Sequence, residues 1–312
     1  MPMCTVCDRR GAIFKRVYSG QQLCARCFCR SIEQKVQATA SKYEMLQPDD
    51  KIMVAVSGGK DSVVLLRLLA RMEEAFPKTT LRAVTIDEGV RGYRDEALEI
   101  AVKNCQELGV EHTVVSFKGM FGYELDRLVT LIREKGMKGL TPCAYCGVLR
   151  RQALNVAARE AGADKLATGH SLDDETQTML LNIIHGDALR IARVAPVLPV
   201  AHPKLVQRIK PVCEVLEREI VLYAYLKKLR FHDTPCPYAG TALRNDVRSM
   251  LNRMEQKHPG TKFAIYRSIE RIRPGLESLA KDGALQNCRF CGEPTVAQTC
   301  RSCQMLRELG IS

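Results

Sequence analysis

Residues 51–62 read Lys-Ile-Met-Val-Ala-Val-Ser-Gly-Gly-Lys-Asp-Ser and decide the fold. Their first half, Lys51–Val56, is a short apolar run rich in valine, which predicts a buried strand. The residues that follow the quoted stretch, Val63–Met72, have the pattern of an amphipathic helix. Two adjacent glycines between strand and helix let the backbone approach an anion, and the start of the helix offers free N–H groups. The order strand, glycine loop, helix therefore predicts a phosphate site, to which Lys60 adds a positive charge.

Further short apolar runs alternate with helical segments along the middle of the chain. The runs predicted as strands are Leu81–Ile86, His112–Phe117 and Lys165–Thr168, and the segments predicted as helices are Tyr93–Leu108, Cys146–Ala161 and a helix that ends near Ile184. This alternation predicts an α/β fold with a doubly wound parallel sheet. Ligands bind such sheets at the carboxyl ends of the strands, where Asp87-Glu88-Gly89 and Gly169-His170 also lie.

Composition describes a basic globular chain. Among 312 residues, 47 Lys and Arg face 35 Asp and Glu, a formal net charge of +12. Such an excess favours a polyanionic partner, above all a nucleic acid, and the alternative is a solvated basic surface. The sequence has neither an apolar stretch of about 18 residues, which a membrane helix needs, nor the apolar segment of a signal peptide. We expect a cytoplasmic protein that does not contact a membrane.

The chain divides into four predicted segments. Residues 1–46 are predicted to form a zinc-binding module with a helix, and residues 47–212 to form the α/β domain that carries the phosphate loop. Residues 213–284 form a helical segment, and residues 285–312 form a second zinc-binding module. Between Arg244 and Lys281 the helical segment carries nine Lys and Arg against four acidic residues, which suits contacts to an RNA backbone. The alternative is a solvated helix face.

Eight of the 14 cysteines form two quartets of paired CxxC turns. The quartets are Cys4, Cys7, Cys24 and Cys27, and Cys288, Cys291, Cys300 and Cys303. Each has the ligand number and spacing of a structural Cys4 zinc site, and the alternative is free surface thiols. Cys29, close after Cys27, is an alternative ligand in the first quartet. Cys105 and Cys213 are predicted to be buried and inert.

A third set of cysteines is incomplete. Cys143 and Cys146 form a CxxC turn without a partner pair, and Cys236 lies in the proline-flanked stretch Pro235-Cys236-Pro237. Three cysteines of this kind indicate a coordination set that leaves one position open.

Several motifs together resemble the tRNA 2-thiouridine synthetases of the PP-loop ATP pyrophosphatase superfamily. They are SGGKDS (57–62), IDEGVRGYR (86–94), PCAYCGVLRR (142–151), ATGHSLDDETQT (167–178), HDTPCPYA (232–239), HPGTKF (258–263) and the two terminal quartets. The first is not a Walker A loop, which requires GxxxxGK[ST]. The resemblance spans essentially the whole chain, and it implies that ATP adenylates the C2 oxygen of a tRNA uridine before sulfur displaces AMP.

The resemblance also implies roles for single residues. The phosphates of ATP, with Mg2+, are held by Ser57, Gly58, Gly59, Lys60, Asp61 and Ser62. Ile86, Asp87, Gly169 and His170 are expected to contact the rest of the nucleotide. Asp174 is expected to be a catalytic or metal-orienting acid, and Arg150 a charge stabiliser at a position where relatives can carry lysine. A developing oxyanion and a leaving pyrophosphate both require cations and N–H donors.

Cys143, Cys146 and Cys236 match the three cluster ligands of these synthetases. Three cysteines on a 4Fe–4S cluster leave one iron open, and that iron is implied to bind the sulfur that is delivered to the uridine. A persulfide carried by two of these cysteines is one alternative, and a third zinc site is another.

Other functions remain open at this point. They are 2-thiocytidine synthesis, lysidine formation and RNA binding by a non-enzymatic zinc-ribbon protein. The modified base is either the wobble uridine, which we favour slightly, or a uridine of the T-loop. We expect tRNA as a partner, a ubiquitin-like sulfur carrier protein or free sulfide as the sulfur donor, and a homodimer.

Overall fold

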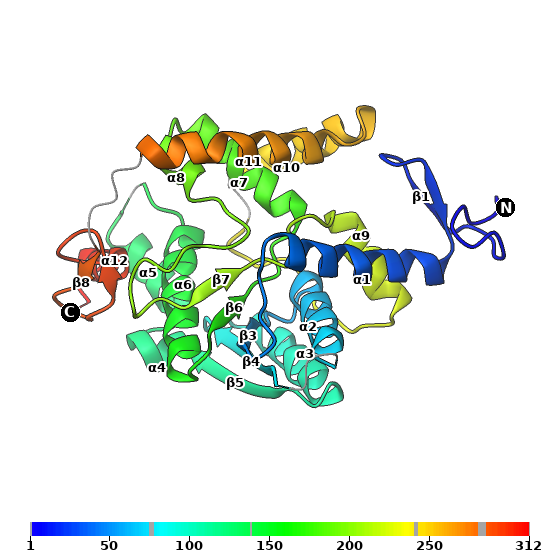
Figure 1. The fold of residues 1–312 in the computed structure, drawn as a ribbon. Coiled ribbons are helices and arrows are strands. Elements are labelled where there is room, and N and C mark those ends of the chain that lie inside the picture. Colours follow the sequence, from blue (N-terminus) through cyan, green and yellow to red (C-terminus); the bar gives the residue numbers. More distant parts are fainter. Residues whose placement is uncertain (1, 75–77, 138, 240–242, 280–284, 312) are drawn as a thin grey trace.

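A five-stranded parallel sheet lies at the centre of the protein (Figure 1). The computed structural model describes residues 2–74, 78–137, 139–239, 243–279 and 285–311. The sheet has the order β5-β4-β3-β6-β7, and every neighbouring pair is parallel. Its strands are β3 (Lys51–Ala55), β4 (Thr80–Asp87), β5 (Glu111–Ser116), β6 (Lys165–Ala167) and β7 (Gln207–Ile209). The predicted doubly wound fold is confirmed, with β7 as a strand that the sequence did not indicate.

Two hydrophobic cores cover the two faces of the sheet because side chains alternate along each strand. Ile52 and Val54 of β3 belong to one core, and Met53 between them belongs to the other. The first core is covered by α1 (Ala25–Lys42), α2 (Lys60–Glu73), α3 (Arg94–Glu107) and α9 (Glu217–Leu226). The second is covered by α4 (Phe117–Phe121), α5 (Leu125–Glu134), α6 (Pro142–Glu160) and α12 (Arg301–Glu308). Cys105 and Cys213 are buried, as predicted.

The remaining helices lie together along one side of the molecule, at the top of Figure 1. They are α7 (Leu172–Ile184), α8 (Ala188–Ala192), α10 (Leu243–Lys257) and α11 (Thr261–Leu279). α10 and α11 form a hairpin that packs on α7, and α11 also packs on α8. Within the described residues, every helix is too short or too polar to span a bilayer.

The two cysteine quartets lie in small modules at opposite ends of the molecule (Figure 1). The N-terminal module contains the hairpin of β1 (Phe14–Arg16) and β2 (Gln21–Leu23), which continues into α1. The C-terminal module contains β8 (Gln286–Asn287), β9 (Pro294–Thr295) and α12. Neither module is large enough for a core of its own, and both pack on the α/β body.

A buried ion pair fixes the helical hairpin to the body. Lys262, at the start of α11, donates to Asp173 in the first turn of α7, and both side chains are nearly inaccessible to solvent. The other Asp173 oxygen accepts the backbone N–H of Glu217 at 2.7 Å. Glu255 of α10 accepts the backbone N–H groups of Gly260 and Lys262, which closes the turn of the hairpin. Lys262 is therefore a structural residue and not one of the cations available to RNA.

We predict that Lys262→Met destabilises the protein by about 3–5 kcal/mol, because Asp173 then keeps a buried charge without its partner. The matched control is Lys42→Met, since Lys42 is half exposed and pairs with Glu214 at the surface. An exposed pair contributes about 0–1 kcal/mol. Urea denaturation followed by circular dichroism measures both changes. Equal losses in the two variants contradict the prediction.

Candidate functional site

The loop between β3 and α2 is built from backbone and hydroxyl contacts. Ser62 Oγ donates to the carbonyl of Gly59 at 2.8 Å and accepts the N–H of Ser57 at 3.0 Å. Gly58 has a φ of +86°, and a Cβ there would lie 2.2 Å from the carbonyl oxygen of Ala97. α2 starts after Gly59 without a side-chain cap, so its first N–H groups face the loop. This geometry suits the predicted phosphate site.

Charged groups surround the same loop. Lys60 Nζ lies 3.0 Å from Asp61 Oδ2 and 2.7 Å from Glu217 Oε1. Burial raises the pKa of Asp61 to about 6, although Lys60 counteracts this rise. The negative charges of Asp174 and Glu217 raise it further. Carboxylates beside a phosphate loop fit the Mg2+ that accompanies ATP, because Mg2+ prefers oxygen ligands.

Arg94 connects this loop to the carboxyl end of β4. Its guanidinium donates to the carbonyls of Ser57 at 2.9 Å and Ile86 at 2.5 Å, and it pairs with Glu88 at 3.0 Å. The Ile86 side chain is buried in the core, so only its backbone is at the site. Asp87 Oδ1 accepts the N–H of Gly89 and shapes the turn after β4. Sequence reasoning did not single out Arg94, although it lies in the IDEGVRGYR motif.

The turn after β6 packs directly on the phosphate loop. A Cβ on Gly169 would lie 2.9 Å from backbone atoms of Asp61, so this close approach requires glycine. His170 Nδ1 lies 2.9 Å from Thr168 Oγ1. His170 is exposed, but desolvation by the surrounding protein and the positive charge of Lys210 lower its pKa to about 4. His170 is therefore neutral at pH 7 and suits contact with an uncharged part of a nucleotide.

Asp174 closes the first turn of α7. Its Oδ2 accepts the N–H of Ser171 at 3.0 Å and the hydroxyl of Ser171 at 2.8 Å, and Ser171 Oγ caps the Asp174 N–H in return. This capping box fixes the carboxylate at the edge of the loop region. Asp174 is near enough to Asp61 and His170 for its charge to raise the pKa of both groups.

The third cysteine set is tied to the phosphate loop by the main chain. His232 N–H donates to the carbonyl of Gly58 at 2.9 Å, which anchors the segment that carries Cys236. Cys143 Sγ, in the first turn of α6, lies 3.3 Å from the carbonyl of Tyr238. The Tyr238 hydroxyl donates to Asp126 at 2.6 Å and holds the far end of this segment.

The three thiols influence each other electrostatically. Burial raises the pKa of Cys146 to about 12, and the charges of Cys236 and Cys143 add to this rise. Cys143 is exposed, and the other two are half buried. Within the described residues, only the two terminal quartets hold three or more possible ligand atoms within 4.8 Å of one another. The central thiols are therefore spread more widely than the ligands of one zinc ion, and three such thiolates fit an iron–sulfur cluster.

Arg150 lies one helical turn beyond Cys146 on α6 and is 47% exposed. Its Nη1 is 3.4 Å from Glu88, the carboxylate that also pairs with Arg94. Glu88 thus joins the cysteine helix to the arginine that holds the phosphate loop. A cation at this place suits a charge stabiliser.

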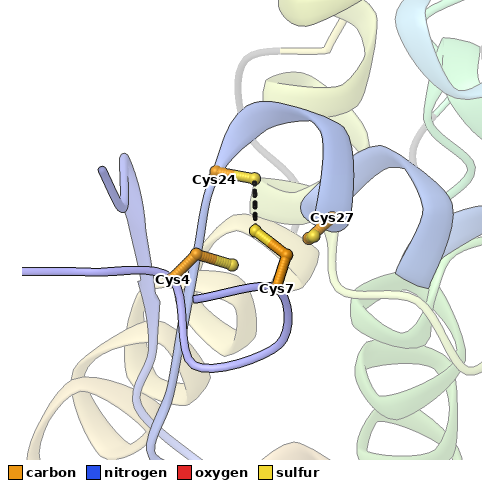
Figure 2. Close-up of side chains that lie close together, drawn as sticks. All are labelled: Cys4, Cys7, Cys24 and Cys27. Carbon is orange, nitrogen blue, oxygen red and sulfur yellow. Dashed lines mark hydrogen bonds between the residues drawn. The ribbon is translucent and has the colours of Figure 1, made fainter. Parts of the chain in front are cut away.

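The N-terminal quartet consists of Cys4, Cys7, Cys24 and Cys27 (Figure 2). Their ligand atoms lie within 4.8 Å of one another, which fits a tetrahedral zinc ion. Burial tends to raise the pKa of Cys4, but backbone N–H groups, first that of Cys24, lower it to about 6. Cys29 is buried in the hydrophobic core outside this group, so Cys27 is the fourth residue of the quartet.

The C-terminal quartet has the same form and is attached to α6. Cys288, Cys291, Cys300 and Cys303 lie within 4.8 Å of one another. Gln152 Nε2 lies 3.7 Å from Cys291 Sγ, and Arg159 makes a bidentate ion pair with Glu293 at 2.7 and 3.0 Å. The helix that carries Cys143 and Cys146 is therefore fixed at its other end by this module.

Comparison with known proteins identifies the class first. The chain matches the PP-loop domain family over residues 29–255. The tRNA 2-thiolation protein NcsA of Haloferax volcanii is 36% identical over 97% of this chain and 98% of its own length. The tRNA-5-methyluridine(54) 2-sulfurtransferase of Pyrococcus horikoshii is 34% identical over 96% of this chain and 92% of its own length.

A solved structure agrees with these relatives. The U34-tRNA thiolase NcsA of Methanococcus maripaludis, solved with its 4Fe–4S cluster, is 35% identical to this chain and superposes with a TM-score of 0.86. The match covers 100% of this chain and 98% of that chain. The protein therefore belongs to the PP-loop domain family and, within it, to the tRNA 2-thiolation proteins.

We predict that Cys27→Ser removes one of two bound zinc ions per chain and that the neighbouring Cys29→Ser removes none. Loss of one of four thiolates opens the site, whereas Cys29 lies outside the quartet. Metal analysis of the purified variants by mass spectrometry measures the difference. Zinc loss in Cys29→Ser, or two zinc ions retained in Cys27→Ser, contradicts this assignment.

Proposed function

We propose that this protein is an ATP-dependent tRNA uridine 2-thiolase, a tRNA sulfurtransferase. The observation that carries the proposal is the hydrogen bond from His232 N–H to Gly58, because it brings a cysteine set and a phosphate loop into one site. An adenylating loop beside thiols is what a two-step replacement of oxygen by sulfur requires. The names of the relatives support the same reaction class.

The phosphate loop serves the first step. The uridine C2 oxygen attacks the α-phosphorus of ATP, the bond to pyrophosphate breaks, and an O-adenylated uridine forms. Lys60 and the N–H groups at the start of α2 stabilise the charge that develops on the leaving pyrophosphate. Arg94 keeps the loop in place through its two carbonyl contacts.

The cysteines serve the second step, in which sulfur replaces the activated oxygen and AMP leaves. A 4Fe–4S cluster, when bound by Cys143, Cys146 and Cys236, supplies an iron that can bind sulfide. The alternative role of a persulfide carrier requires a thiolate near neutral pH. Burial raises the pKa of Cys146 to about 12, so a persulfide role lacks a ready thiolate there, whereas a metal that binds a thiol deprotonates it.

The exposed face of the helical hairpin offers cations for RNA. The exposed basic side chains on α10 and α11 are Arg248, Arg253, Lys257, Arg267 and Arg271. Arg244 instead donates to Thr178 at 2.5 Å, and Lys281 lies outside the described residues. Of the basic residues predicted to contact RNA, these five exposed side chains remain available to bind a phosphate backbone.

We propose the wobble uridine as the target, in line with the name of the solved relative. The T-loop uridine is the alternative, supported by the name of the Pyrococcus protein at nearly the same identity. We also propose that the protein forms a homodimer. Its sulfur donor is proposed to be a ubiquitin-like carrier protein or free sulfide. Cytoplasmic location agrees with the name of the Chlamydomonas relative, which is 35% identical.

For the test, the protein is first reconstituted anaerobically with iron and sulfide. ATP, a sulfide source and unmodified tRNA are then added. Mass spectrometry of nuclease fragments locates the product. We expect 2-thiouridine in the anticodon fragment, and thiolation in the T-loop fragment moves the target there. Thiolated cytidine, or no thiolation, refutes the proposed activity.

We predict that Cys236→Ala abolishes thiolation and leaves ATP-dependent pyrophosphate release within about threefold of wild type. Cys236 belongs to the sulfur step, whereas the backbone contact of His232 that orders the loop is unchanged. The control Cys213→Ala removes a buried thiol outside the site and is expected to retain thiolation. Wild-type thiolation by Cys236→Ala contradicts the assignment.

A further inference from the structure

Four arginines gather beside the cysteine helix, and they are called the arginine cluster below. They are Arg150 and Arg151 on α6, Arg190 on α8 and Arg208 on β7. Arg208 pairs in register with Leu166 of β6, whose side chain lies in the core beneath α6. In-register residues of parallel strands project to the same face, so Arg208 points to the α6 side of the sheet.

Arg151 is an exposed residue of α6 that follows Arg150. A Cβ placed on Gly147 would be 3.4 Å from Arg151 Nη1, so the guanidinium extends back along the helix over Gly147. Desolvation is the main cause of the lowered pKa of both Arg151 and Arg208. The charges of Arg150 and Arg190 lower the pKa of Arg151 further, and that of Arg151 lowers the pKa of Arg208 further. Arg150, Arg190 and Arg208 are therefore each close enough to Arg151 for their charges to interact.

The cluster has too few anionic partners. Arg150 pairs with Glu88 and Arg190 with Asp187. In the part of the chain that the structure describes, the side chains of Arg151 and Arg208 make no ion pair. Arg208 Nε has less than 1 Å² of exposed surface and no hydrogen-bond partner.

An arrangement of this kind is unfavourable for the protein alone. A buried donor without a partner costs about 1–3 kcal/mol, and more when it carries charge. Burial and the neighbouring Arg151 lower the pKa of Arg208 to about 10, which still leaves it protonated at pH 7. An oxyanion bound between these side chains accepts the unpaired N–H of Arg208 and offsets the repulsion between the guanidinium groups. The planar guanidinium also matches the geometry of phosphate oxygens.

We propose that Arg151 and Arg208, with Arg190 at the rim, bind backbone phosphates of the RNA next to the reacting uridine. The proposal rests on the proposed function and adds a binding site to it. ATP phosphates already have the loop before α2, whereas Arg208 lies on β7, two strands away from β3. Pyrophosphate released in the reaction is the other source of the same oxyanion chemistry, and the experiment separates the two.

The experiment measures the tRNA dissociation constant over a range of salt concentrations for wild type, Arg208→Met and Arg151→Met. Each lost phosphate contact is expected to flatten the slope of log K against log salt by about 0.7–0.9. We expect each variant to bind tRNA about tenfold more weakly at low salt. Arg208→Lys keeps the positive charge but loses the planar guanidinium. We therefore expect its salt slope to stay near that of wild type while its affinity for tRNA falls.

The control is Arg82→Met, which removes an exposed arginine at the amino end of β4 that pairs with Glu111. It is expected to leave the slope unchanged. Thermal unfolding separates a binding role from a structural role. If Arg208 serves only to bind an anion, the unfolding midpoint of Arg208→Met is equal to or above that of wild type. A lower midpoint with an unchanged slope overturns the proposal.

Two further outcomes are decisive. If Arg208→Met weakens product inhibition by pyrophosphate and leaves the tRNA slope unchanged, the site binds pyrophosphate and the RNA assignment is wrong. If wild type thiolates tRNA but neither variant changes the slope, the arginine site fails and the proposed function stands. A flattened slope in a protein that thiolates no tRNA supports the RNA site and refutes the proposed activity.

Discussion

The site depends on backbone segments that approach each other too closely for side chains. Gly58 leaves no room for a Cβ against the carbonyl of Ala97, and Gly169 leaves none against the backbone of Asp61. These contacts bring the carboxyl ends of β3 and β6 together with α3. The carbonyl of Gly58 then accepts the N–H of His232, so the conformation of one glycine positions the cysteine segment as well. The loop and the segment that carries Cys236 are consequently joined at Gly58.

Local sequence patterns predicted most strands of the sheet. The pairing between segments distant in the sequence could not be predicted from them. The apolar run Lys51–Val56 became β3 (Lys51–Ala55), and Leu81–Ile86 became the central part of β4. β7 has three residues and is defined by its pairing with β6 and by a bridge from Ile209 to Val197, so no periodicity indicates it. Spacing alone assigned the zinc quartets, because a CxxC turn fixes its own ligand geometry.

Charged residues were harder to assign, since the sequence shows a charge but not the group that faces it. Lys262 counted among the RNA-binding cations, yet it is buried against Asp173, which lies 89 positions away. Glu217 lies in none of the sequence motifs. Its contact with Lys60 arises because α9 packs beside α2. In both cases a tertiary contact determines whether a charge supports the fold or remains available to a ligand.

The same distinction separates the structural charges from the arginine cluster. The buried pair of Arg16 and Glu219 shows a charge that is matched within the fold, since the carboxylate also accepts the Tyr18 hydroxyl. Arg208 is only partly buried, but its Nε is inaccessible to solvent and has no hydrogen-bond partner. A fold selected only for stability replaces such a side chain with an apolar one, because that substitution removes a desolvation penalty. Its presence beside the cysteine helix is therefore better explained by an anionic ligand, which supplies the charge that the protein omits.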